Sequence, residues 1–184
     1  YFPPLEGDKV IQIGSCIKVF GEKECALKHI ITLDTCDPIP GTEVVQCKEE
    51  KDVLLEWTKL IQKLDPDVIS GYNIFGFDFK YMYERAEELN IQDDFGLLSR
   101  FREEECKLEE KFLQSSGMGD NELSYVPMPG RVLFDLFKVV QNSYKLDSYK
   151  LDAVASYFMK GKVKNIDVDT ITTDNLGKLI MYNN

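Results

Sequence analysis

One stretch of the sequence, residues 66–82, combines residue types suited to chemistry on phosphates. Val68 and Ile69 form a short β-branched run between a proline and a glycine, which predicts a buried strand. From Asp78 onward the apolar spacing becomes helical. The predicted order is therefore strand, loop and helix, with Asn73 in the loop and Asp78 in the first turn of the helix.

A carboxylate at this position suits a metal ligand. Active sites of open α/β sheets lie outside the carboxyl ends of the strands, where this loop falls. Mg²⁺ prefers hard oxygen donors held by one or two carboxylates together with substrate phosphates. The alternative is that Asp78 only stabilises the start of its helix. The helical stripe on the same face is predicted to contain Asp78, Met82, Arg85, Ala86 and Leu89.

Longer motifs connect the stretch to a known family. The pattern Asn-x-x-x-Phe-Asp after Gly-Tyr, from Asn73 to Asp78, resembles the second exonuclease motif of family B DNA polymerases. The match continues through the Pro-Asp-Val-Ile-Ser-Gly-Tyr-Asn run and into Tyr-Met-Tyr-Glu-Arg-Ala. Residues 144–151, Tyr-Lys-Leu-Asp-Ser-Tyr-Lys-Leu, resemble the delta-type replicative polymerases and those of large DNA viruses. The resemblance covers residues 8–182.

The resemblance implies an α/β, ribonuclease-H-like proofreading fold, with a mixed sheet flanked by helices. It also implies an inserted β-hairpin that helps to move the primer strand between two sites, which we place at 123–131. The implied reaction is 3′–5′ hydrolysis at a single-stranded primer end, assisted by two Mg²⁺ or Mn²⁺ ions. The implied partners are DNA, nucleotides in the parent polymerase, and a sliding clamp or accessory subunit, at a nuclear or viral replication site.

Four carboxylates hold the ions in that family, and part of this set matches the sequence. Asp78 corresponds to the ligand of the second motif, and Tyr182 to the tyrosine of a final Tyr-x-x-x-Asp, which positions the attacking water. Asn73 and Phe77 correspond to substrate-side positions. Bases of a frayed primer can also stack on Tyr72, Phe75 and Phe77. Packing is the alternative for these rings, and for Phe75 the two interpretations are evenly balanced.

The remaining carboxylates are missing. No Asp-x-Glu precedes residues 9–14, and the final aspartate would fall two residues beyond Asn184. The chain also begins without a methionine. We therefore expect one domain over 1–184 that is an incomplete fragment at both ends, without its first strand and without activity by itself. A second hypothesis is a retired exonuclease that serves as a scaffold and binds DNA or partner subunits.

Composition limits the classes of function. Among 184 residues the formal net charge is −10, which argues against a module that grips DNA by its phosphates alone. The five cysteines form no Cys-x-x-Cys pair, which is typical of reduced residues in an intracellular protein. The single histidine, His29, lies in an apolar run and is predicted to be a strand residue. No membrane span or signal sequence is apparent.

The elements that must position the site follow from periodicity. Strands are predicted over 9–20 and 25–33 as an antiparallel hairpin, over 43–47, and over 132–135. Helices are predicted over 53–64, over 95–112 as a solvated helix with a charge run at 100–111, over 136–144, and after Ser148 as a cap. Asp135 lies where a strand meets a helix and, if the strands are parallel, shares the sheet edge of Asp78. It is predicted to be a capping residue or a neighbour of the metal ligands, with a direct metal role as the less favoured alternative.

Overall fold

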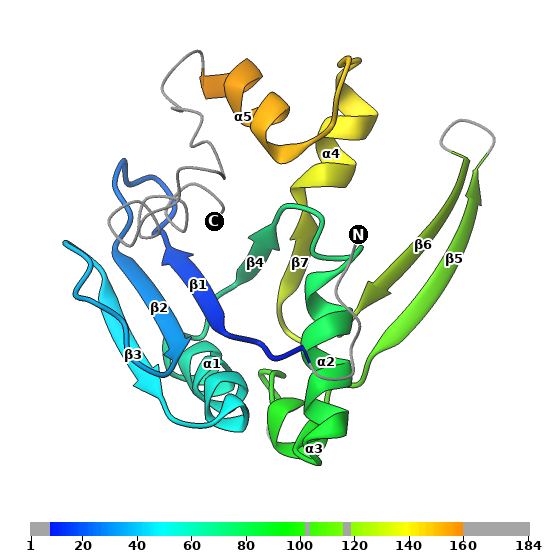
Figure 1. Cartoon of the computed structure of the whole chain (residues 1–184). Helices are drawn as coiled ribbons and strands as arrows, with labels where there is room; N and C mark the ends of the chain where they lie inside the picture. The colour runs from blue at the N-terminus through cyan, green and yellow to red at the C-terminus, as the bar shows by residue number, and fades with distance from the viewer. Residues whose placement is uncertain (1–7, 102–103, 116–118, 160–184) are drawn as a thin grey trace.

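The computed structural model describes residues 8–101, 104–115 and 119–159 and shows a mixed α/β arrangement of helices and three small sheets (Figure 1). Strand β1 (Gln12–Ile17) pairs antiparallel with β2 (Leu27–Leu33), and β3 (Glu43–Cys47) adds to β2 in parallel. The predicted hairpin and third strand are confirmed. His29 lies in β2, as predicted. It is also buried, and this burial lowers the pKa of its imidazole.

Helix α1 (Glu50–Leu64) covers this sheet. Its apolar residues recur at helical spacing, and Val53, Leu54 and Trp57 are buried. The helix ends where Asp65 turns into the left-handed region, with a φ of 47°, and its N–H donates to the carbonyl of Ile61. A proline follows and prevents another turn. The predicted helix and its end are confirmed.

Strands β4 (Val68–Gly71) and β7 (Val132–Asp135) form a parallel pair. Helix α2 (Asp78–Glu88) follows β4, and α4 (Leu136–Ser143) and α5 (Leu151–Met159) follow β7. The prediction of a buried β4 is wrong, because Val68 is 54% exposed and the strand has a partner on one edge only among the described residues. In this part of the chain β1 and β4 are not hydrogen-bonded, so the expected single sheet is divided.

The described residues of the charged segment do not form the helix predicted over 95–112. Helix α3 (Gln92–Phe95) ends at the first residue of this range, and β5 (Glu109–Ser115) begins within it and pairs antiparallel with β6 (Gly119–Tyr125). The N–H of Arg100 donates to the carbonyl of Pro129, and that of Cys106 to Gly96. These non-local hydrogen bonds are incompatible with a helix. The hairpin precedes the predicted position at 123–131.

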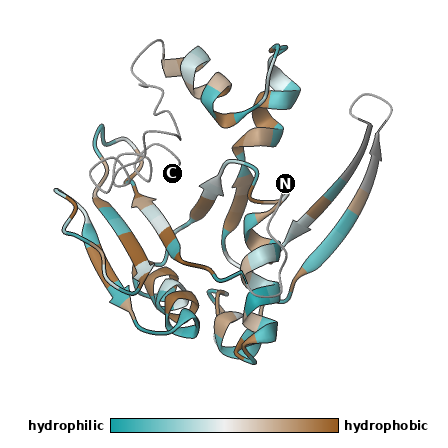
Figure 2. Ribbon diagram, viewed as in Figure 1, coloured by the Kyte–Doolittle hydropathy of each residue, from teal (hydrophilic) through white to brown (hydrophobic). Residues whose placement is uncertain are grey.

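Apolar residues gather where α1 faces the β1–β3 sheet and where α2 and α3 pack against α1 (Figure 2). On α2 the buried aromatic residues are Phe79 and Tyr83, next to Ala86. The predicted stripe is thus only partly right: Asp78 is exposed, whereas Arg85 is buried in an ion pair with Glu50. Within the described residues no helix is both long and apolar enough to span a bilayer.

Candidate active site at the carboxyl edge of the parallel strands

The two acidic residues singled out by the sequence lie at one edge of the β4–β7 pair. The parallel register places Gly71, at the end of β4, beside Asp135, at the end of β7. The loop 72–77 leaves β4 at this edge, and α2 begins at Asp78 directly after it. The expectation that both acids share an edge is confirmed because the strands are parallel.

Asp78 is the first residue of α2 and is exposed to solvent. The cap position before it is Phe77, which provides no side-chain hydrogen bond to the helix. Surrounding protein raises the pKa of the Asp78 carboxyl by partial desolvation, its own backbone N–H opposes this rise, and the charge of Asp135 adds to it. An accessible carboxylate of this kind can bind a metal cation that is also coordinated by a substrate phosphate.

Asp135, by contrast, is buried, with 3% of its surface exposed. Its Oδ1 accepts hydrogen bonds from the N–H groups of Asn73, at 2.8 Å, and Phe137, at 2.9 Å. Its Oδ2 accepts from the N–H of Phe75 at 3.0 Å. The cap interpretation is confirmed, since the carboxylate caps α4 and also binds the loop after β4. These contacts do not favour a direct metal role.

Asn73 lies in the left-handed region, with a φ of 63°, which asparagine tolerates better than most residues. Its carbonyl accepts a hydrogen bond from the N–H of Gly76 at 2.9 Å. A Cβ atom at Gly76 would lie 2.4 Å from Oδ1 of Asn73. The asparagine side chain is therefore folded over the glycine, and the pair defines the turn.

The aromatic residues of the loop point to different elements. The hydroxyl of Tyr72 donates to the carbonyl of Tyr149 at 2.5 Å, and its ring meets Phe137 edge-on with centroids 5.6 Å apart. Phe77 stacks on Tyr81 of α2, with centroids 5.0 Å apart. Tyr72 thus attaches the loop to the segment between α4 and α5, whereas Phe77 stays beside Asp78.

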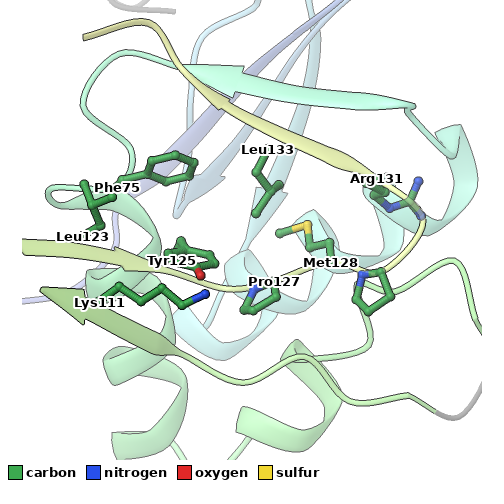
Figure 3. A pocket seen from close by; sticks show the side chains of 9 residues that line it. Phe75, Lys111, Leu123, Tyr125, Pro127, Met128, Arg131 and Leu133 are labelled. Carbon is green, nitrogen blue, oxygen red and sulfur yellow. The ribbon is translucent and has the colours of Figure 1, made fainter. Parts of the chain in front are cut away.

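Phe75 contacts the β5–β6 hairpin. Its carbonyl accepts a hydrogen bond from the N–H of Ser124 at 2.8 Å, and its ring lies 5.6 Å from that of Tyr125. Phe75 also lines an apolar cavity of about 450 Å³, together with Met128 and Leu133 (Figure 3). These contacts favour the packing interpretation of this ring. No local pattern in the sequence predicted this connection between the loop and the hairpin.

The described residues supply only part of a metal site. Among them no group of three His, Cys, Asp or Glu side chains is placed to hold a metal ion. Asp78 fits one ligand position, because its carboxylate is exposed and not committed as a helix cap. Tyr182, the second predicted catalytic residue, lies outside the described residues.

Comparison with known proteins shows the family to which the chain belongs. The sequence model of the DNA polymerase family B exonuclease domain matches residues 1–154. A DNA polymerase of Pyramimonas orientalis virus is 51% identical over 189 residues, covering 100% of this chain and 16% of the viral protein. The DNA polymerase delta catalytic subunit of Dictyostelium discoideum is 39% identical, covering 98% of this chain and 17% of that protein. The chain thus spans about a sixth of the length of these relatives. It belongs to the family B DNA polymerases, within the region of their exonuclease domain.

Proposed function

We propose that this chain is the proofreading 3′–5′ exonuclease domain of a DNA-directed DNA polymerase that acts in DNA replication. It would remove a mispaired nucleotide from the single-stranded 3′ end of a primer by metal-assisted hydrolysis of a phosphodiester. The observation that carries this proposal is the accessible carboxylate of Asp78, held at the carboxyl edge of two parallel strands. The match of the chain to the family B exonuclease domain supports the same reaction.

Asp78 is proposed as a ligand of Mg²⁺ or Mn²⁺. Bound at such a site, two ions lower the pKa of the attacking water and stabilise the leaving 3′ oxygen. Since the described residues contain no three-ligand group, we propose that the other carboxylates come from parts of the polymerase outside them. Tyr182 is proposed to orient the attacking water, which is a geometric role.

The loop 72–77 is proposed to receive the primer end. Phe77 is partly exposed beside Asp78, and its stack on Tyr81 gives it a fixed orientation for a terminal base. Stacking of a base on such a ring contributes about 1–3 kcal/mol. Asn73 is proposed to face the same substrate. Tyr72 and Phe75 are proposed to contribute to substrate binding indirectly, because their contacts hold the loop that carries Phe77.

The arrangement of the strands supports a ribonuclease-H-like sheet. In Figure 1 the strands follow one another as β3, β2, β1, β4 and β7, yet β1 and β4 each have a hydrogen-bonded neighbour on one edge only among the described residues. Unpaired backbone groups on a strand edge favour the addition of another strand. We propose that a strand from outside the described residues, carrying an Asp-x-Glu motif, pairs with these edges. The β5–β6 hairpin is proposed to guide the primer strand.

The proposed partners are single-stranded DNA, nucleotides and a sliding clamp or accessory subunit of the polymerase, at a nuclear or viral replication site. With a net charge of −10, the chain is proposed to depend on other domains of the polymerase to hold the DNA. The test is excision by the full-length polymerase on a labelled single-stranded oligonucleotide. Mg²⁺-dependent shortening from the 3′ end that EDTA abolishes is expected. Absence of shortening with an active polymerase site would instead favour the scaffold hypothesis.

A further inference from the structure

We propose that Asp135 is a positioning residue for the exonuclease reaction, which sets the loop 72–77 and thereby the place of Asp78 and Phe77. The inference rests on the proposed function, because the loop matters for catalysis only if the primer end binds there. Asp135 itself would touch neither the metal nor the DNA. It would act through the backbone of the loop.

The carboxylate of Asp135 connects three parts of the fold. It ends β7, caps α4 through the N–H of Phe137, and accepts two N–H groups of the loop, those of Asn73 and Phe75. The loop residues lie about sixty positions away in the sequence, at separations of 62 and 60 residues. One side chain thus fixes the spacing between the ends of the two parallel strands.

The charge of this carboxylate is balanced by backbone groups. Within the described part of the chain, no lysine or arginine forms an ion pair with Asp135. Its stabilisation comes instead from three N–H donors and from the N-terminus of α4. Loss of any one of these hydrogen bonds would leave a buried N–H group without an acceptor, which destabilises the folded state.

Backbone hydrogen bonds connect the loop to the first turn of α2. The carbonyl of Ile74 accepts the N–H of Phe79 at 3.3 Å, and that of Phe77 accepts the N–H of Tyr81 at 2.9 Å. The backbone held by Asp135 therefore continues without a break into the first turn of α2. A shift of the loop would displace Asp78 and Phe77 together, and a displacement of about 1 Å can lower a reaction rate by two orders of magnitude.

The variant Asp135→Asn separates this role from simple packing. Asparagine has nearly the same shape but only one accepting oxygen, and its NH₂ group would face a donor. If the oxygen stays with Asn73 and Phe137, the N–H of Phe75 loses its acceptor. In the flipped orientation the other two N–H groups lose theirs. Either way the loop is released while the volume of the side chain is conserved.

The first readout needs neither metal nor DNA. Amide hydrogen exchange of the full-length polymerase, measured in EDTA, reports on the loop directly. In Asp135→Asn we expect exchange over residues 72–79 to accelerate by about tenfold or more. Asp93→Asn is the matched control, since it makes the same chemical change at an exposed acid in the first turn of α3. It is expected to change exchange only near residues 92–96.

The second readout is excision by the same variants. For Asp135→Asn we expect excision to fall by about tenfold or more and the half-saturating Mg²⁺ concentration to rise, with DNA synthesis unchanged. Asp93→Asn is expected to match the wild type. Unchanged loop exchange, or faster exchange with normal excision, would overturn the inference. So would a proportional loss of excision and synthesis, which indicates general unfolding. If the wild type shows no excision, the proposed function fails, and the positioning role fails with it whatever the exchange shows.

Discussion

Arg85→Met would remove the cation of a buried ion pair that joins α2 to α1. The Nε and NH2 groups of Arg85 donate to the two carboxylate oxygens of Glu50, at 2.8 and 2.6 Å. Glu50 also accepts the N–H of Val10, at the start of the path into β1, at 2.8 Å. The side chains of the pair are only 5% and 3% exposed. The pair therefore fixes α2, and Asp78 at its start, against the first sheet.

Replacing Arg85 by methionine leaves the Glu50 carboxylate buried with one backbone donor. Breaking a buried pair in this way costs about 3–5 kcal/mol. At 1.36 kcal/mol for each factor of ten, local opening of α2 should increase by about two to four orders of magnitude. Glu50→Gln should cost less, because Arg85 keeps an ion pair with Glu88, whose side chain is 42% exposed.

The assay is native-state hydrogen exchange of the α2 amides in the full-length polymerase, because unfolding of a multidomain protein is not a two-state process. Lys59→Met is the matched control, since its ion pair with Glu56 lies at the surface, where solvent screens the interaction. Exchange in Arg85→Met within a factor of ten of the wild type would refute the reasoning. It would show that water or a rearranged side chain compensates the Glu50 charge.

Two further predictions concern the loop and its acid. Because the folded state raises the pKa of Asp78, ionising this carboxyl destabilises the fold, and stability is lost as the pH rises from the ordinary carboxyl pKa, about 3.9, through the raised value. Asp78→Asn should therefore be more stable than the wild type at pH 7 in EDTA, and this difference in stability should vanish below about pH 4. Thermal unfolding of the domain at both pH values measures the difference. A variant less stable than the wild type at pH 7 would contradict the prediction. Gly76→Ala should lower excision by about tenfold or more, because its Cβ would lie 2.4 Å from Oδ1 of Asn73 and displace that side chain, which is proposed to face the substrate. Gly41→Ala is the control, since its φ of 72° strains the exposed turn locally but no atom lies within 4 Å of the added Cβ. Equal excision by both variants would show that the Asn73 side chain adapts.

Local periodicity was sufficient to predict the elements whose apolar residues follow a regular helical or strand spacing. The spacing of Val53, Leu54 and Trp57 identified α1, and short apolar runs identified β3 and β7. The same reasoning failed over 95–112, where a run of charged residues is compatible with either structure. There the carbonyls of Gly96 and Pro129 take the backbone N–H groups instead. Tertiary contacts override a weak local preference.

The candidate site was predictable in part for a similar reason. The strand-to-helix junction placed Asp78 correctly at the first position of α2, and parallel strands placed Asp135 at the same edge. The hydrogen bonds that organise the loop join residues about sixty positions apart, and no local pattern encodes such pairs. The contact between Phe75 and Ser124 was unpredictable for the same reason. Tyr182 lies outside the described residues, so its role stays a prediction.

The central claim is that Asp78 serves the removal of a mispaired 3′ end. The most direct measurement compares excision and synthesis by the full-length polymerase with those of Asp78→Ala, on a primer with a terminal mismatch. Asp93→Ala is the control, because Asp93 is also an exposed acid in the first turn of a helix. We predict that Asp78→Ala abolishes Mg²⁺-dependent excision and preserves synthesis, while Asp93→Ala retains both. Excision by Asp78→Ala at the wild-type rate would contradict the account.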